Sequence, residues 1–253
     1  MSSLPKNFWT TLPLGRGVTL LQFDANGLGA FAKPAGTLSH PNEAGEEPRS
    51  LLTVPYTFEG ECYEWKNADG AWRKLWLLNR LDAATSGVIL VASSEKLATE
   101  IRAQFRRKRV KKIYAALVFG APVKTTELWR DLLLVDKKGG KIRAAVYAGD
   151  VPAESRMSLV RAGMGEPKIS LIKLEPVTGR SHQLRVQCAK RHLPIIGDLT
   201  YGDFGRNRAF AKQSGVKRLC LHSLETSFSY EWAGRSFEFA TRAELPEEFT
   251  TVR

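Results

Sequence analysis

Residues 77–91 read LLNRLDAATSGVILV and place one carboxylate and one arginine between two apolar runs. The run at 88–91 is continuous and mostly β-branched, which predicts a strand buried on both faces. The apolar residues 76–78 predict a second strand. Between them, Gly87 can adopt the positive φ that a sharp turn requires. Asp82 is therefore predicted to lie on a loop held by two rigid strands, a common way to present a reactive group.

This stretch alone leaves two interpretations of Asp82 open. The first is a reactive carboxylate on a rigid scaffold. The second is a structural residue that forms an Asx turn or an ion pair with Arg80. A second stretch of the chain favours the first interpretation.

The second stretch, residues 174–202, reads LEPVTGRSHQLRVQCAKRHLPIIGDLTYG. Residues 168–174 predict a strand. The segment 176–179, which contains Pro176 and Gly179, is predicted to end it. Ser181 is predicted to cap a helix over residues 182–191 that buries Leu184 and Cys188. Arg185 then lies in the first turns of that helix, near a strand-to-helix loop.

Together, the two stretches resemble the RluA-like family of RNA pseudouridine synthases. The family motif H-R-L-D-x-x-T-S-G is matched by NRLDAATSG at 79–87. The motifs G-R-T/S-H-Q-I/L-R-V and P-I-x-G-D-x-x-Y-G are matched by GRSHQLRV and PIIGDLTYG. Shorter matches follow the family order at KPAG, KIYAALV and LCLHS, which are residues 33–36, 112–118 and 219–223. The resemblance runs from about Val18 to the C-terminus.

Two residues depart from the family pattern. Asn79 replaces the usual histidine before the Arg-Leu-Asp sequence, and Gln187 stands where many members have histidine. Both leave the matched acid and arginine intact, so they bear on substrate choice or loop packing more than on reaction type. His182 is expected to orient its neighbours by hydrogen bonding and not to act as an acid or base.

The resemblance implies the pseudouridine synthase catalytic fold. This fold is of the α+β class, a mixed and mostly antiparallel sheet with flanking helices and a central RNA-binding cleft, and the predicted order of strands and helices agrees with it. We expect residues 1–17 to form an N-terminal lead-in and residues 18–253 to form one catalytic domain. No S4-like RNA-binding segment precedes the matched region, so a stand-alone catalytic domain is expected.

Local patterns predict the other main elements. Asn-Gly predicts a turn between strands at 18–23 and 27–32. Ser94 is a predicted N-cap for a helix over 95–107. A strand at 113–119 is expected to precede a basic hairpin around Gly139-Gly140, which could touch RNA backbone or be an ordinary exposed loop.

The chain is strongly basic, with 38 Lys and Arg residues against 26 Asp and Glu residues and a formal charge of +12. Such an excess favours a polyanionic partner such as nucleic acid. The densest basic run spans the end of the predicted helix, and phosphate contact is a better interpretation of it than a solvated helix end. Its members are Arg102, Arg106, Arg107, Lys108, Arg109, Lys111 and Lys112.

Tryptophans at 65, 72 and 76 alternate with basic residues. Aromatic side chains in such a setting can stack on unpaired bases. Burial in a core is the commoner fate of tryptophan, so this interpretation carries less weight.

The resemblance also implies roles for single residues. Asp82 is the catalytic carboxylate, as a nucleophile on the sugar or base or as a base toward the ribose. Arg185 is its cationic partner, which keeps a desolvated carboxylate ionised. Tyr114 is expected to stack on the uracil and assist loss of the C5 proton, and Leu184 to pack against the ring. Arg80 is expected to fill the space that a flipped base leaves or to hold phosphate. Arg106, Arg107 and Lys112 are expected to bind phosphate.

The sequence implies neither a cofactor nor a metal. Isomerisation needs no redox change, and Cys62, Cys188 and Cys220 are too widely spaced to indicate a disulfide framework or a zinc site. No stretch approaches the roughly 20 apolar residues that span a bilayer. We therefore expect a cytoplasmic monomer, away from membranes, with ribosomal or transfer RNA as its partner.

The expected activity is that of an isomerase, an intramolecular transferase that converts uridine in RNA to pseudouridine. One competing hypothesis is a non-catalytic RNA-binding or RNA-chaperone protein that retains the fold. It is disfavoured because Asp82, Tyr114 and Arg185 are all present. A base-excising glycosidase would usually need a second carboxylate, and the sequence shows no such partner near Asp82.

Overall fold

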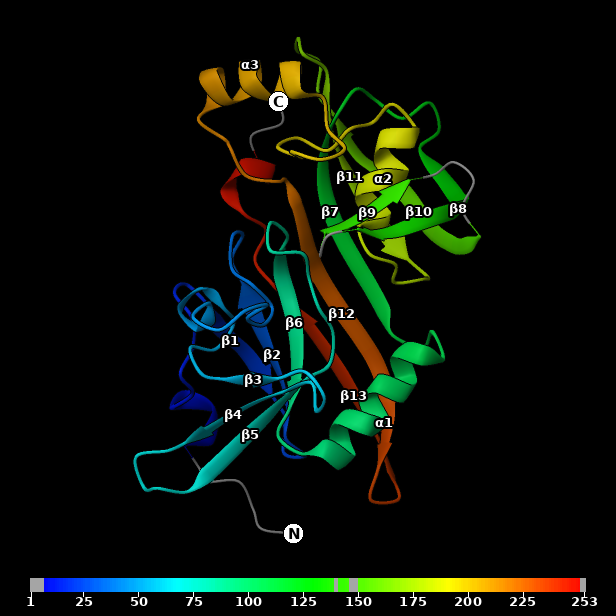
Figure 1. Ribbon diagram of the computed structural model, residues 1–253. Coiled ribbons are helices and arrows are strands. Elements are labelled where there is room, and N and C mark those ends of the chain that lie inside the picture. Colours follow the sequence, from blue (N-terminus) through cyan, green and yellow to red (C-terminus); the bar gives the residue numbers. More distant parts are fainter. Residues whose placement is uncertain (1–6, 139–140, 146–149, 251–253) are drawn as a thin grey trace. The chain divides into compact units, whose positions relative to one another are not determined.

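The computed structural model describes residues 7–138, 141–145 and 150–250 (Figure 1). The chain forms two compact units. Unit 1 takes in the described residues up to Val110 together with Glu225–Ala243, and unit 2 takes in the rest. The assignment of residues 18–253 to a single catalytic domain stays a prediction.

Unit 1 is built on an antiparallel sheet. Its strands pair in the order β1 (Thr19–Phe23), β2 (Leu28–Lys33), β6 (Ser86–Ala92), β5 (Trp72–Leu77), β4 (Cys62–Lys66) and β3 (Tyr56–Thr57). The hairpin of β12 (Leu221–Trp232) and β13 (Arg235–Arg242) also lies in unit 1 from Glu225 onward. The predicted pair of strands joined by Asn-Gly is confirmed as β1 and β2.

Strand β6 separates two hydrophobic clusters of unit 1, and all of its residues are buried. Successive side chains of a strand point to opposite faces. Val88 and Leu90 accordingly belong to one cluster, and Ile89 and Val91 belong to the other, which also contains Trp9. The prediction of a strand buried on both faces is confirmed.

Helix α1 (Glu95–Arg106) covers the first of these clusters. The Ser94 Oγ accepts a hydrogen bond from the Leu97 amide at 3.4 Å, so the predicted cap is confirmed. Leu97 and Ile101 are fully buried against β6 and β2, one turn of helix apart on its apolar side.

The N-terminal segment closes the second cluster. Trp9 lies in a short 3-10 turn (Phe8–Thr10), and its indole rests directly on Gly29 of β2. A Cβ at position 29 would approach the indole to 2.3 Å, so only glycine fits there. The described part of the predicted lead-in is therefore packed into the core of unit 1. The remaining 3-10 turns are Glu47–Arg49 and Glu247–Phe249.

Unit 2 is also built from antiparallel strands. Its strands pair in the order β7 (Lys111–Phe119), β11 (Ile169–Pro176), β10 (Val151–Ala162), β8 (Thr126–Lys138) and β9 (Lys141–Ala145). The predicted hairpin is confirmed as β8 and β9. Its predicted turn, Gly139-Gly140, lies outside the described residues.

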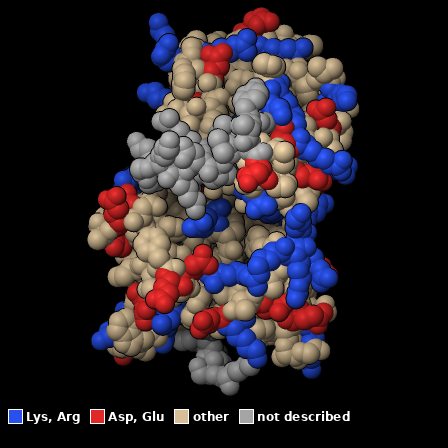
Figure 2. All heavy atoms as spheres, turned by 45° about the vertical axis from the view of Figure 1, so that its right-hand side comes forward, with Lys and Arg blue, Asp and Glu red and all other residues tan. Residues whose placement is uncertain are grey.

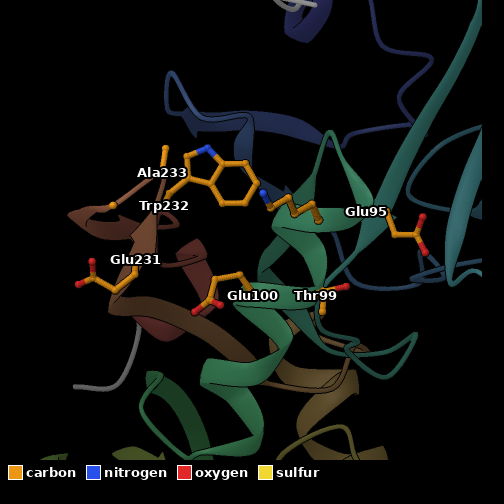
Figure 3. A pocket seen from close by; sticks show the side chains of 8 residues that line it. Glu95, Thr99, Glu100, Glu231, Trp232 and Ala233 are labelled. Carbon is orange, nitrogen blue, oxygen red and sulfur yellow. The ribbon is translucent and has the colours of Figure 1, made fainter. Parts of the chain in front are cut away.

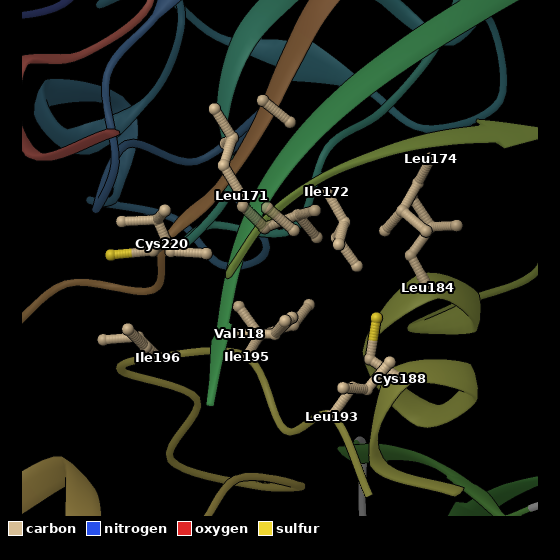
Figure 4. Close-up of a cluster of buried hydrophobic side chains, with 14 of the residues drawn as sticks. Val118, Leu171, Ile172, Leu174, Leu184, Cys188, Leu193, Ile195, Ile196 and Cys220 are labelled. Carbon is tan, nitrogen blue, oxygen red and sulfur yellow. The ribbon is translucent and has the colours of Figure 1, made fainter. Parts of the chain in front are cut away.

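Helix α2 (Gln183–Lys190) covers the core of unit 2 and positions part of the predicted site. Figure 4 shows Leu184 and Cys188 projecting from α2 toward Leu174 and Leu193. The prediction that Ser181 caps this helix is wrong. The N-cap is His182, whose backbone is left-handed with φ of 55° and whose side chain makes no capping bond.

Helix α3 (Phe204–Ser214) was not predicted from the sequence as a separate element. Asp203 caps its start by accepting a hydrogen bond from the Arg206 amide at 2.9 Å, and Gly215 ends it with φ of 78°. Both are standard helix-end signals. The strands and the three α-helices of the described residues confirm the predicted α+β class. None of the helices described is long and apolar enough to cross a membrane.

Candidate active site

Asp82 lies on the short loop between β5 and β6, as predicted, and is half-buried. The Thr85 amide donates a hydrogen bond to the Asp82 carbonyl at 3.0 Å and closes a turn. Gly87 then takes φ of 111°, a conformation that residues with a Cβ rarely adopt. The loop therefore holds the carboxylate at the start of the most deeply buried strand of unit 1.

A buried ammonium group fixes the residue after Asp82. Lys33, at the end of β2, is 1% exposed, and its Nζ donates to the carbonyls of Pro34 at 3.1 Å, Thr37 at 2.6 Å and Ala83 at 3.1 Å. A buried charge is tolerable only when its donors are satisfied in this way. Lys33 thus ties the Asp82 loop to the segment that follows β2.

A hydroxyl group fixes the residue before Asp82. The Ser39 Oγ donates to the Leu81 carbonyl at 2.8 Å and accepts from the Leu81 amide at 3.0 Å. The Tyr63 hydroxyl donates to the Ser39 carbonyl at 2.7 Å and holds that segment in turn. The backbone on both sides of Asp82 is therefore clamped, a feature that no local sequence signal indicated.

The two residues that precede Leu81 have different roles. The Asn79 Oδ1 accepts a hydrogen bond from the Leu90 amide of β6 at 2.7 Å. The departure from the family histidine is thus accommodated by a bond that packs the loop onto β6. Arg80 is exposed, which is compatible with its predicted contact to phosphate.

The predicted residues of unit 2 lie on two neighbouring elements. Tyr114 is half-buried on β7 and is paired in register with Leu174 of β11. Leu184, on α2, is buried in the same hydrophobic cluster against which Tyr114 packs. The structure therefore brings the predicted base-stacking tyrosine and the predicted apolar contact to one core.

Arg185 is held by a carboxylate that sequence analysis did not assign a role. Its Nε donates to the Asp198 Oδ2 and its Nη2 to the Asp198 Oδ1, both at 2.8 Å. Asp198 also accepts from the amides of Thr200 and Tyr201. Burial raises the pKa of Asp198, but the bonds from Arg185 and from the amides outweigh it and leave the pKa below its usual value. Asp198 belongs to the matched motif at 194–202, which was the signal available.

An aromatic ring packs on the same arginine. The Arg185 guanidinium lies 5.1 Å from the centre of the Tyr201 ring, within range of a cation–π interaction. The Tyr201 hydroxyl is 2.9 Å from the His182 Nδ1. His182, Arg185, Asp198 and Tyr201 therefore form one network at the start of α2, which agrees with the orienting role predicted for His182.

The second departure from the family pattern is also accommodated by hydrogen bonds. The Ser155 Oγ donates to the Gln187 Oε1 at 2.8 Å, and the Gln187 Nε2 donates to the Asp131 Oδ2 at 2.9 Å. Lys190 and Arg191 form ion pairs with the same carboxylate at 2.7 and 2.9 Å. Gln187 is thus a buried link between α2 and the sheet of unit 2.

The basic run that begins within α1 and continues past it divides into structural and exposed members. The Arg102 Nη2 donates to the Leu77 carbonyl at 2.7 Å and pairs with Glu61, so this residue fastens α1 to the sheet. Arg106 and Arg107 are exposed and form no ion pair with any described residue. Burial lowers the pKa of the half-buried Lys112. Figure 2 shows broad areas of Lys and Arg side chains on one face, interrupted by smaller acidic groups.

A hollow of about 580 Å³ lies elsewhere in unit 1, between the start of α1 and the turn of the β12–β13 hairpin (Figure 3). Glu95, Glu100 and Glu231 give it an acidic rim, and Lys96 lies over the Trp232 ring. None of the predicted site residues lines it. Among the described residues, no group of three or more His, Cys, Asp or Glu side chains is arranged to hold a metal ion.

Comparison with known proteins identifies the family. The sequence profile of RNA pseudouridylate synthases matches residues 29–190. The chain belongs to this family. The match includes Asp82, Tyr114, Leu184 and Arg185 of the predicted site. The RluA-like resemblance is thereby confirmed.

Curated relatives of the family differ in the RNA that their names mention. A ribosomal large subunit pseudouridine synthase C from Vibrio vulnificus is 35% identical over 158 residues, 62% of this chain and 48% of the relative. A tRNA pseudouridine synthase C from Vibrio cholerae is 32% identical over 211 residues, 80% of this chain and 82% of the relative. The chain thus spans about half the length of the first relative and most of the second.

Solved structures support the fold. The human RNA pseudouridylate synthase domain containing 1 matches 90% of this chain and 84% of its own, with a TM-score of 0.65 and 20% sequence identity. The human RNA pseudouridylate synthase domain containing 4 has the same TM-score at 21% identity. The predicted pseudouridine synthase fold is therefore confirmed.

Proposed function

We propose that this protein isomerises uridines in structured RNA to pseudouridine and that Asp82 is the catalytic carboxylate. The observation that carries the proposal is the double clamp on the Asp82 loop. Lys33 holds the Ala83 carbonyl and Ser39 holds both backbone groups of Leu81, so the backbone on both sides of the half-buried Asp82 is fixed. When the backbone around a reactive group is held in this way, little conformational change is needed to reach the geometry of the reaction.

The reaction exchanges one bond of the sugar for another. The N1–C1′ bond breaks, the uracil turns within the site, and C5 joins C1′. The C5 proton is then lost and N1 takes up a proton, so the composition of the nucleotide is unchanged. The ionised Asp82 acts as a nucleophile or as a base on the ribose.

Other residues keep the reactive groups in the correct state. Following the family resemblance, Arg185 is assigned to favour the ionised form of Asp82, because a cation stabilises the charged form of a desolvated carboxylate. Its pairing with Asp198 supports this assignment, because it fixes the direction of the guanidinium. Tyr114 is assigned to stack on the uracil and assist removal of the C5 proton, and Leu184 to pack on the ring.

The target base must leave the helical stack, at a cost of a few kcal/mol. Contacts to phosphate can offset this cost, and we assign them to Arg106, Arg107 and Lys112. Arg80 is assigned to fill the vacated space or hold a phosphate. The exposure of Arg80, Arg106 and Arg107 supports these roles.

Ribosomal RNA and transfer RNA are both retained as substrate classes, since the relatives are named for one or the other. We further propose that the protein works in the cytoplasm as a monomer. A pseudouridine map of total RNA from cells that lack the gene tests the activity and identifies the substrate. Loss of one or a few sites, restored by wild-type protein and not by Asp82→Ala protein, is the expected result.

Purified protein separates the competing hypotheses. Asp82→Asn should abolish turnover while the Kd for the mapped RNA stays within about twofold of wild type. A map that does not change, with RNA binding intact, would support a non-catalytic binding protein. Release of free uracil from RNA would instead indicate a glycosidase.

A further inference from the structure

An aromatic group in unit 1 is connected to the Asp82 loop by hydrogen bonds and takes no part in the roles assigned above. The His40 and Tyr56 rings are stacked, with centroids 4.6 Å apart and planes 9° from parallel. The Phe58 ring is 5.4 Å from each of them and nearly perpendicular to both. Because the two distances are equal, Phe58 rests against the side of the stacked pair and not on top of it.

This group is rigid on its inner side and open on its outer side. His40 is 9% exposed, and its Nδ1 lies 2.9 Å from the Pro41 carbonyl oxygen. Tyr56 packs on the buried Tyr63, with ring centroids 5.0 Å apart. Phe58, in contrast, is 58% exposed. A large aromatic ring is thus presented to solvent on a support that fixes its orientation.

Hydrogen bonds connect the aromatic group to the Asp82 loop. Ser39, the residue before His40, bonds to both backbone groups of Leu81, and Tyr63 bonds to the Ser39 carbonyl. The exposed Arg80 directly precedes Leu81 on that loop. Burial and the charge of Glu61 raise the pKa of the Tyr56 hydroxyl to about 12. The charges of Arg80 and Arg102 oppose this rise.

Other exposed aromatic residues of unit 1 lack this combination. Trp72 is 61% exposed, but it lies at the outer end of β5, with Lys66 over its ring. Phe23 is 50% exposed and stacks on Trp9 at the N-terminal segment. Of the tryptophans that the sequence suggested for stacking, Trp65 is buried.

We infer that the Phe58 ring, supported by His40 and Tyr56, is a stacking platform for one unpaired base of the substrate RNA other than the target uridine. The inference rests on the proposed function. Stacking of a base on an aromatic ring is independent of sequence and suits a strongly basic protein whose partner is RNA. The exposed Arg80 beside the platform supplies the positive charge that holds the adjoining phosphate.

The test compares Phe58→Leu and Phe58→Trp with wild type on the RNA fragment that the pseudouridine map identifies. Leucine keeps apolar packing against His40 and Tyr56 but has no aromatic face. Phe58→Leu should raise KM and Kd roughly tenfold at unchanged kcat, the size expected for loss of one base stack, and Phe58→Trp should stay near wild type. Trp72→Leu is the matched control and should change neither constant.

Substrates that lack one base identify the position of the platform. RNA fragments with an abasic nucleotide at each site flanking the target uridine should bind wild type normally except at one site. At that site the abasic fragment should lose roughly tenfold in affinity for wild type and nothing further for Phe58→Leu. Equal losses for wild type and Phe58→Leu at every site would overturn the inference, as would unchanged KM and Kd for Phe58→Leu.

The two proposals fail in distinguishable ways. If purified wild type does not convert the mapped fragment, the proposed function fails, while the Kd comparison on that fragment still tests the platform. If wild type is active and Phe58→Leu matches it in KM and Kd, the platform is wrong and the proposed function stands. A thermal melt of each variant shows that it is folded before either comparison is made.

Discussion

Arg185 and Asp198 meet edge to edge, with two parallel hydrogen bonds of 2.8 Å each. The Asp198 side chain is 1% exposed and the Arg185 side chain 9%. Such forked pairing fixes the plane of a guanidinium as well as its position. The arginine that the family resemblance assigns to catalysis therefore has its direction set by a second residue of the same unit.

Removing Asp198 should be costly. Asp198→Ala leaves a buried guanidinium without its carboxylate, so the free energy of unfolding should fall by about 3–5 kcal/mol. Urea unfolding followed by circular dichroism measures this change. Glu225→Ala, which breaks the exposed pair with Arg242, is the control and should cost less than about 1 kcal/mol. Equal losses in the two variants would contradict the role given to Asp198.

Lys33→Met should impair both stability and turnover. The change removes the buried ammonium group from three carbonyls, so a loss of about 2–4 kcal/mol in unfolding free energy is expected. The Asp82 loop also loses its bond at Ala83, so kcat should fall more than KM changes. Steady-state kinetics on the mapped RNA checks this. Lys66→Met, at an exposed position on β4, should behave as wild type, and a wild-type kcat for Lys33→Met would remove the positioning role.

Arg106 and Arg107 should contribute to binding through phosphate and not through base recognition. Each contact to phosphate contributes about one unit to the slope of log Kd against log salt concentration. Arg106→Ala and Arg107→Ala should therefore each flatten that slope by about 0.7–0.9 and weaken binding to unrelated RNA as well. Filter binding over a range of salt concentrations measures this slope. Arg235→Ala, exposed at the start of β13, is the control expected to keep the wild-type slope.

His222 should make the fold sensitive to mild acid. Burial, with the nearby charge of Arg218, lowers the pKa of His222 to about 4, whereas the unfolded chain titrates near 6.5. Above pH 6.5 both states are neutral at this residue. As the pH falls from about 6.5 toward 4, the unfolded state takes up a proton that the folded state does not, so stability decreases across that window. Urea midpoints measured between pH 7 and 4 should decline less in His222→Gln than in wild type.

Elements with strong local signals could be predicted from the sequence. The continuous apolar run of β6, the spacing and Ser94 cap of α1 and the Asn-Gly turn before β2 each depend on residues close together in the chain. The start of α2 could not be predicted in the same way. Ser181 is a typical capping residue, but the left-handed backbone of His182 begins the helix one residue later.

The supports of the candidate site depend on pairings between residues distant in sequence. Asp82 and Arg185 could be identified from matched motifs. Asp198 also lies inside a matched motif, but the sequence does not show that its carboxylate binds Arg185. The bond from Ser39 to Leu81 spans 42 residues and follows no periodic pattern. Lys33 is a similar case. Only the structure shows that its ammonium group is buried and donates hydrogen bonds to three carbonyls.

Strand β6 has hydrophobic clusters on both faces, and this has a consequence for hydrogen exchange. Amides of such a strand are released only when both clusters come apart, so they should exchange at rates set by unfolding of the whole of unit 1. The Asp82 loop joins this strand directly. The carboxylate that we propose to be catalytic is thus anchored to a segment expected to be among the slowest-exchanging of the unit.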